Sequence, residues 1–305
     1  MSRDLYQRLG HRTACDSENI VDMVGMTRGH IADPYIVAKL MRGDEARIRS
    51  CVGSTYCSNF RYCIQNPATA REAHLPHIIK KNLDQTKKVV VIGAGPAGLE
   101  AARVCALRGH QVTLFEAAHQ AGGQVLLAGK VHWRNDLNTI IDWLEKEIQI
   151  LAVDIRFNYF AEKADILAEN PDVVIIATGG SPNTEWINGN ARVVNAWDVL
   201  SGMVQLTGHV FIHDQTGRNT ALTVADYLSE KGVSVTLNTQ DAQIGAEAMR
   251  LEMSPFMKHF YERDVKMSVD HELLAAHAED KQTRVTLRNI HTTATTDEFV
   301  DHLVV

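Results

Sequence analysis

The sequence predicts an α/β fold with doubly wound, parallel sheets. Short apolar runs of strand length alternate with segments of helical spacing, and the run at residues 89–92 leads directly into a glycine-rich turn and a helix. The same strand–turn–helix pattern starts again near Gly208. The 305 residues, 45% apolar and 22% charged, suit a globular protein of roughly two domains.

Apolar runs and helix start and stop signals define the individual elements. At the N-terminal end we expect a buried strand at 20–26 and a turn at 27–29, followed by a helix at 35–42 with Asp33 as N-cap and Pro34 at its first position. Further strands are expected at 89–92, 111–115, 171–178, 209–213, 233–238, 265–270, 282–288 and 298–305. Further helices are expected at 99–108, 133–148, 220–231 and 246–263.

Charge and composition argue against several classes of protein. The net charge is −6 without a basic block, so neither a nucleic acid nor a membrane surface is an expected partner. The apolar runs are too short to span a bilayer, and the polar N-terminal stretch MSRDLYQRLGHRT does not resemble a secretory signal. Five cysteines are too few for a disulfide scaffold. We therefore expect a cytoplasmic protein.

The turn GAGPAG after the first of the two strand–turn–helix units has the complete context of a dinucleotide site. Gly93 permits the tight turn, Gly95 lets the backbone approach a pyrophosphate, and Gly98 allows close packing of helix on strand. Ala97 lies in the same turn, where the helix start offers N–H groups to phosphates. Glu116 ends the next strand, where an acid bonds ribose hydroxyls and repels a 2′-phosphate. This predicts FAD, NAD or ADP rather than NADP; the alternative is a glycine turn in an ordinary βαβ unit.

Two further segments narrow the choice of ligand. Gly123 and Gln124 follow the acid closely, and Thr178 and Gly179 end a later strand. Both segments resemble the two-dinucleotide-domain flavoproteins related to disulfide reductases, in which the first motif binds the ADP part of FAD. The resemblance implies FAD or ADP at the first turn, with these four residues beside it.

The second strand–turn–helix unit lacks the glycines of the first. Its turn reads HDQTGRNT at residues 213–220, and only Gly217 remains of a GxGxxG pattern. Side chains would occupy the space in which a pyrophosphate must approach the backbone. We therefore expect a nucleotide-domain topology with a degraded phosphate site.

Three cysteines, Cys51, Cys57 and Cys63, share one short window. In a chain without export signals, such a group indicates a metal or an iron–sulfur cluster. The alternative is a loop in which some of the cysteines pack as small hydrophobic residues.

Four motifs in their order resemble one family. They are MVGMTRGHIADPYIVAKL, CVGSTYC, CIQNPATAREAHLPH and VVVIGAGPAGLEAA. The family is that of the iron–sulfur flavoproteins trimethylamine and dimethylamine dehydrogenase, 2,4-dienoyl-CoA reductase and the N-methylproline (stachydrine-type) demethylases. The demethylases look most similar. The resemblance implies an FMN-binding (β/α)8 barrel, a 4Fe-4S cluster and two nucleotide-binding-like domains.

The resemblance also implies roles for individual residues. Gly25 and Arg28 match the last barrel strand and the turn at the FMN phosphate, and the three cysteines match cluster ligands. The sequence departs from the family at Ser54, where many members have a cysteine, and in the short gap between Cys57 and Cys63. Only 88 residues precede the first dinucleotide strand, whereas a barrel needs about 250.

The resemblance implies four segments in a chain truncated at both ends. Residues 1–46 would be the remnant of the barrel, 47–86 the iron–sulfur segment and linker, 87–205 the FAD- or ADP-binding domain, and 206–305 an incomplete second nucleotide-binding-like domain. No catalytic residue is assigned, because those of the family would lie on the absent barrel strands.

The implied function is that of a fragment of an FMN/FAD iron–sulfur oxidoreductase. Its parent would oxidise a small N-methyl amine and pass electrons from flavin through the cluster to an electron-transfer flavoprotein. The alternatives are a non-catalytic adenine-dinucleotide-binding module and an NAD(P)H-dependent enoate reductase. Formation of a homo-oligomer stays open.

Overall fold

The computed structural model describes residues 25–82 and 84–305, and contacts divide the chain into two compact units. The first unit runs to Gly179; the second is Gly180–Val305 together with Lys130–His132. Most of the strand expected at residues 20–26 lies outside the described residues. Within the described ranges, no helix is long and apolar enough to cross a bilayer.

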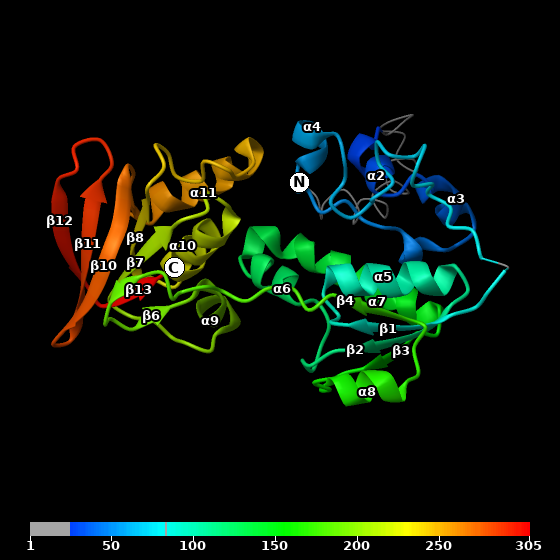
Figure 1. The fold of residues 1–305 in the computed structure, drawn as a ribbon. Helices are drawn as coiled ribbons and strands as arrows, with labels where there is room; N and C mark the ends of the chain where they lie inside the picture. Colours follow the sequence, from blue (N-terminus) through cyan, green and yellow to red (C-terminus); the bar gives the residue numbers. More distant parts are fainter. Residues whose placement is uncertain (1–24, 83) are drawn as a thin grey trace. The chain divides into compact units, whose positions relative to one another are not determined.

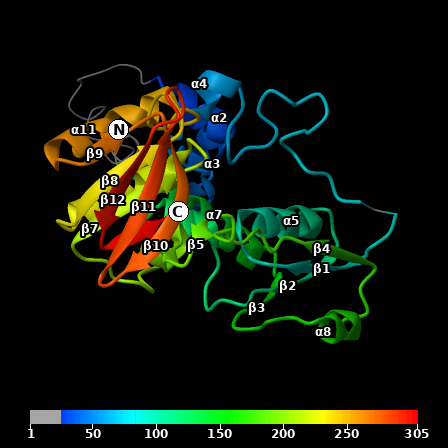
Figure 2. The same ribbon diagram turned by 60° about the vertical axis from the view of Figure 1, so that its left-hand side comes forward.

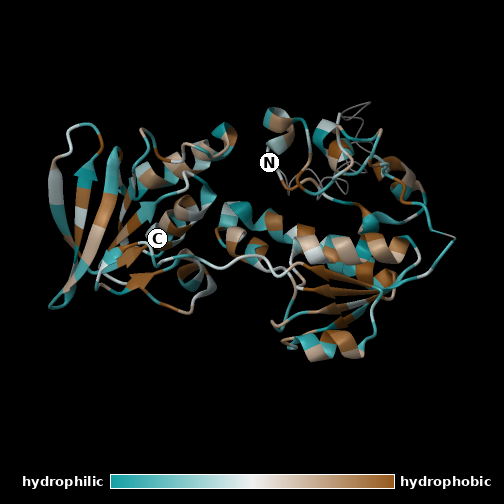
Figure 3. Cartoon of the chain, viewed as in Figure 1, coloured by the Kyte–Doolittle hydropathy of each residue, from teal (hydrophilic) through white to brown (hydrophobic). Residues whose placement is uncertain are grey.

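The first unit is built on a parallel sheet with strand order β3-β2-β1-β4. The strands are β1 (Lys88–Ile92), β2 (Gln111–Phe115), β3 (Asp154–Arg156) and β4 (Val173–Ile176), as Figure 1 shows. Helices α5 (Pro96–Leu107), α7 (Thr139–Ile150) and α8 (Lys163–Ala168) connect them, with α6 (Gln124–Ala128) and the 3₁₀ helix η2 (His132–Asn138) between β2 and α7. The strands are largely hydrophobic (brown in Figure 3), and the alternating residues Val89 and Val91 of β1 pack in one core with Leu99 and Leu114.

The N-terminal part of the first unit corrects two sequence predictions. Residues 27–29, expected as a turn, belong to helix α2 (Thr27–Ala32), because the carbonyls of Met26 and Gly29 each accept an N–H four residues on. Helix α3 (Ile36–Met41) is preceded by Tyr35, so Asp33 is not its N-cap and Pro34 not its first residue. The Asp33 carboxylate instead accepts N–H groups from Tyr35, Arg49 and Lys39.

The cysteine segment, with 3₁₀ helix η1 (Glu45–Arg47) and α4 (Tyr56–Phe60), is attached to the dinucleotide domain through α7. Arg47 makes a two-pronged ion pair with the buried Glu147, at 2.8 and 2.9 Å. The indole N–H of Trp143 donates to the carbonyl of Arg47 at 3.0 Å, and the Arg49 guanidinium lies 4.2 Å from the centre of the Trp143 ring. These contacts make the cysteine segment part of the first unit.

The second unit contains a five-stranded parallel sheet with strand order β6-β13-β7-β8-β9. The strands are β6 (Val193–Val194), β7 (His209–Asp214), β8 (Ser234–Thr239), β9 (Lys266–Ser268) and β13 (His302–Val304). Helices α9 (Ala196–Ser201), α10 (Asn219–Glu230) and α11 (Arg250–Glu262) accompany it. Strand β7 lies at the centre of this sheet, and its residues Val210, Phe211 and Ile212 are fully buried.

An antiparallel layer in the second unit corrects the prediction of parallel sheets alone. Strands β10 (His271–Glu279), β11 (Gln282–Asn289) and β12 (Thr295–Val300) form it with the short β5 (Asn188–Gly189) at one edge, and Figure 2 shows them side by side. The connections between β10, β11 and β12 are too short for the crossover that parallel strands need, whereas β5 pairs with β10 in parallel. The single strand expected at 298–305 is divided at Asp301, whose carboxylate accepts the N–H of His209 at 2.7 Å, so that β12 and β13 join different sheets.

Candidate functional site

The first glycine turn has the backbone geometry that the sequence predicts. Gly93 has φ +98°, and a Cβ there would lie 2.5 Å from the carbonyl oxygen of Ala177. A Cβ on Gly98 would overlap the carbonyl oxygen of Gly93. A Cβ on Gly95 would meet nothing within 4 Å. Two of the glycines are therefore required by the fold itself, whereas Gly95 borders open space at the start of α5.

Glu116 closes one side of this turn. Its carboxylate accepts the backbone N–H of Ala94 at 2.6 Å and that of Ala118 at 2.8 Å. The acid expected to bond a ribose therefore lies within reach of the glycine turn. Both of its oxygens are held by backbone amides, which fixes the orientation of the carboxylate.

The three predicted segments of the dinucleotide site converge. The N–H of Gly122 donates to the carbonyl of Ala94 at 2.9 Å, and a Cβ on Gly123 would lie 3.5 Å from the Cα of Gly95. A Cβ on Gly179 would lie 3.4 Å from Nε2 of Gln124. Thr178 borders the turn as well, with its Cα 3.2 Å from a Cβ built on Gly93. One cradle is therefore lined by the glycine turn, by the segment Gly122–Gln124 and by the end of β4. This cradle fits a pyrophosphate.

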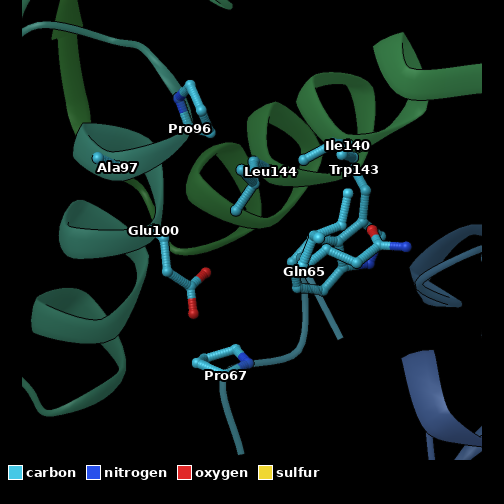
Figure 4. Close-up of a pocket in the computed structure, with 9 residues that line it drawn as sticks. Gln65, Pro67, Pro96, Ala97, Glu100, Ile140, Trp143 and Leu144 are labelled. Carbon is cyan, nitrogen blue, oxygen red and sulfur yellow. The ribbon is translucent and has the colours of Figure 1, made fainter. Parts of the chain in front are cut away.

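A cavity of about 250 Å³ lies behind the start of α5, and its lining includes Ala97 of the predicted dinucleotide turn. Figure 4 shows Pro96, Ala97 and Glu100 of α5 facing α7 and the cysteine segment across it. The remaining lining residues are Ile64, Gln65, Pro67, Ile140, Trp143 and Leu144. Both oxygens of Glu100 accept N–H groups from Arg103 at 2.7 Å, so the one carboxylate in the lining is already paired. The cavity lies between the nucleotide helix and the cysteine segment.

The three cysteines of the window are free of disulfide bonds and half-buried. Burial raises the pKa of the Cys51 thiol, while the Arg28 guanidinium lowers that pKa and the nearby Cys63 and Cys57 thiols raise it. The three thiols are therefore close enough to influence one another. Even so, the described part of the chain contains no group of three or more His, Cys, Asp or Glu side chains arranged to hold a metal ion. As placed here, the cysteines do not fit a cluster.

The two residues matched to an FMN phosphate do not share one cavity. Gly25 lines an open hollow with Thr27, His30 and Glu72, among others. Arg28 is exposed on α2 and is not part of that lining. Its charge instead acts on Cys51, so the structure links it to the cysteine window.

The second turn, at the end of β7, is filled by its own carboxylate. Asp214 is 2% exposed, and its Oδ1 accepts the backbone N–H groups of Thr216 and Gly217, each at 3.0 Å, and the Thr216 hydroxyl at 3.2 Å. Burial raises the pKa of Asp214, and these hydrogen bonds oppose that rise. Amides that a phosphate would need are therefore bound to Asp214. The sequence showed the missing glycines but not this replacement.

The chain is similar to several known enzymes over most of its length. It is 43% identical over 291 residues to the "Multifunctional alkene reductase/demethylase OYE" of Caballeronia cordobensis, covering 94% of this chain and 43% of the relative. It is 45% identical over 262 residues to the "Probable N-methylproline demethylase" of Rhizobium meliloti (84% and 38%). It is 42% identical over 300 residues to the "N,N-dimethylglycine/sarcosine dehydrogenase" of Chromohalobacter salexigens (93% and 43%). The chain thus spans about two fifths of the length of these relatives, and its resemblance to the amine dehydrogenase and demethylase group is confirmed.

Solved structures share the fold. A 2-naphthoyl-CoA reductase complex matches with a TM-score of 0.84 at 29% identity, covering 95% of this chain and 44% of that one. Histamine dehydrogenase from Rhizobium sp. 4-9 matches with a TM-score of 0.85 at 24% identity (95% and 48%), which shows the fold alone. The family model described as "Pyridine nucleotide-disulphide oxidoreductase" matches residues 87–305, which take in both glycine turns described above. The chain therefore belongs to the pyridine nucleotide-disulphide oxidoreductase family.

Proposed function

We propose that this chain supplies the adenine-dinucleotide part of a flavin-dependent oxidoreductase that, as a whole protein, oxidises an N-methylated amine. One observation carries the proposal: the first glycine turn is open beside Gly95, whereas the second is closed by Asp214. The first turn can therefore hold FAD or ADP, whereas the second turn of the described chain offers no free amides to the pyrophosphate of a nicotinamide dinucleotide. Electrons then come from the substrate rather than from NAD(P)H.

The relatives support the amine branch. Two of the three named above are described as acting on N-methylated compounds only, and the other as both an alkene reductase and a demethylase. The proposal is tested against two alternative functions, a non-catalytic nucleotide-binding module and an enoate reductase.

The dinucleotide would be held by residues of the first unit. The proposed contacts are Gly93, Gly95, Ala97 and Gly98 at the pyrophosphate, Glu116 at the ribose, and Gly123, Gln124, Thr178 and Gly179 at the rim. The bound flavin would accept electrons; the protein would orient it and, through the start of α5, stabilise its phosphate charge.

Further proposals concern the parts of the whole protein that surround this chain. Residues 1–46 would be the end of an FMN-binding barrel, in which Gly25 and Arg28 contact the FMN phosphate of the intact parent. Residues 47–86, 87–205 and 206–305 would be the iron–sulfur, dinucleotide and second nucleotide-like segments. A small amine, an electron-transfer flavoprotein and a second copy of the chain are the proposed partners, in the cytoplasm.

The test is to identify the bound cofactor and its reductant. Extraction of the purified chain should release FAD or ADP, and any flavin bands should not bleach anaerobically with NADH or NADPH. Rapid bleaching by either nicotinamide would instead favour the reductase. A chain that binds no adenine nucleotide at all would overturn the proposal.

Any iron site is proposed to use Cys51, Cys57 and Cys63. Because these thiols do not form a metal site as placed, binding of iron requires them to move together. Iron and sulfide should be measured after anaerobic reconstitution, with Cys105→Ser as the matched control, since that thiol lies in α5. If the triple serine variant of the three window cysteines retains as much iron as the control, the assignment is wrong.

A further inference from the structure

A second cavity lies wholly within the second unit, at the carboxyl ends of strands β7 and β13. It has a volume of about 200 Å³ and is bordered by the N-terminal parts of α9 and α10 and by residues 182–186. The carboxyl ends of parallel strands are where α/β proteins bind ligands. The proposed function above does not use this cavity.

The polar lining of this cavity contains one acid and no basic side chain other than a histidine. Asp214 lines it, and the Oδ2 of this carboxylate is buried without a hydrogen-bond partner, while Oδ1 is used by the turn. A buried, unpaired carboxylate oxygen is costly and indicates a missing donor. The lining contains no lysine or arginine, and none of its indole, amide and hydroxyl groups bonds this oxygen, although Trp186, Trp197, Asn183, Gln215, Thr216 and Thr220 carry such groups.

His213, next to it, adds a second acceptor. Its Nδ1 lies 2.7 Å from Oδ1 of Asn238, and Nδ2 of Asn238 donates to Ser268 at 3.2 Å. This orientation makes the Asn238 oxygen an acceptor, so Nδ1 of His213 carries the proton and Nε2 offers a lone pair. Burial lowers the pKa of His213, which favours the neutral ring.

Two tryptophans complete the lining. Trp186 and Trp197 both border the cavity, and the Trp186 ring centre lies 5.8 Å from that of His213. Indole faces attract organic cations more strongly than other aromatic side chains do. A carboxylate, a neutral imidazole and two indoles favour a cation that carries N–H donors.

We propose that this cavity binds a small protonated organic amine, in the place where related topologies would hold a dinucleotide. Its N–H groups would donate to Asp214 and His213, and its apolar part would lie against Trp186 and Trp197. A nucleotide is excluded, because the amides of the turn are occupied and an acid faces the site. The inference does not depend on the amine oxidation proposed for the whole protein.

Calorimetric titration of the purified chain with benzylammonium tests the proposal, with benzyl alcohol and benzoate as neutral and anionic comparators. Benzylammonium should bind saturably, with the alcohol at least about tenfold weaker and benzoate not detected. Tryptophan fluorescence should change with the same midpoint. Equal binding of all three compounds, or no binding by benzylammonium, would overturn the proposal.

The Asp214→Asn variant tests the proposed amine site while it keeps a hydrogen-bond acceptor for the turn. Asparagine retains an oxygen for the N–H groups of Thr216 and Gly217 but replaces the unpaired oxygen by a donor, so benzylammonium affinity should fall by about tenfold or more. The matched control is Asp280→Asn, the same change in an exposed turn between β10 and β11. Circular dichroism and urea denaturation report whether either variant is folded. Unchanged affinity in a folded Asp214→Asn protein contradicts the proposal.

Discussion

The two strand–turn–helix units of this chain have the same topology, but the first turn is open to a phosphate and the second is occupied by a carboxylate. In each, a parallel strand leads through a short turn into a twelve-residue helix, α5 or α10. The first turn places glycine where a phosphate would approach, and the second places a buried aspartate there. The comparison shows that topology alone does not determine which ligand a nucleotide-like domain can hold.

The difference follows from how the turn amides are satisfied. Buried backbone N–H groups must find an acceptor. In the second turn the acceptor is the side chain of Asp214, bonded to Thr216 and Gly217. In the first turn Glu116 bonds Ala94, and the position of Gly95 stays open to a ligand.

The largest expected effect comes from closing the open turn. Gly95→Val should lower the affinity for FAD or ADP by at least about a hundredfold, because a branched side chain would fill the pyrophosphate space. Folding should be unaffected, since no atom lies within 4 Å of the new Cβ. Titration with ADP measures the effect, and Gly95→Ala should fall in between. Wild-type affinity in the valine variant would show that the nucleotide binds elsewhere.

Removing the carboxylate that closes the second turn should lower the stability of the second unit. Asp214→Ala removes the acceptor for two backbone N–H groups and a hydroxyl, so the free energy of unfolding of the second unit should fall by about 1–3 kcal/mol. ADP binding at the first turn should not change. Urea denaturation followed by tryptophan fluorescence measures the loss; a variant as stable as wild type would mean that water replaces the carboxylate.

Glu116 is expected to determine the choice between ribose and 2′-phosphoribose. Glu116→Gln should weaken ADP binding by about tenfold, because a charged hydrogen-bond acceptor is replaced by a neutral one. The penalty against 2′-phosphorylated ADP should shrink, since the repelling charge is gone. Competition between the two nucleotides measures this, with Glu185→Gln in the second unit as the matched control. An unchanged preference would remove Glu116 from the ribose site.

The smallest effect is a dependence of stability on pH. Because burial lowers the pKa of His213 below its usual 6.5, the folded state binds this proton less readily than the unfolded state. Stability contributed by the neutral ring is therefore present above pH 6.5 and is lost as pH falls from 6.5 toward the folded pKa. His213→Asn, which keeps a donor to Asn238, should flatten the melting temperature over this range. A profile parallel to wild type, measured beside the same change at exposed His119, would contradict this.

The sequence by itself determined the open turn, because that turn is local. The conformation of Gly93, the close approach at Gly98 and the position of Glu116 one strand later depend on residue types at fixed spacing. The main strands and helices followed from periodicity in the same way, and β2 was predicted with its observed bounds.

Only the tertiary structure determined which segments pair with one another and which buried polar atoms find a partner. The antiparallel layer β10–β12 and the pairing of Arg47 with Glu147 depend on contacts between segments that local patterns do not encode. The hydrogen bonds from Thr216 and Gly217 to Asp214 are local, but the burial of the second Asp214 oxygen without a partner depends on the surrounding strands and helices. Local spacing constrains backbone conformation, whereas the partner of a buried polar atom is set by packing across the whole unit.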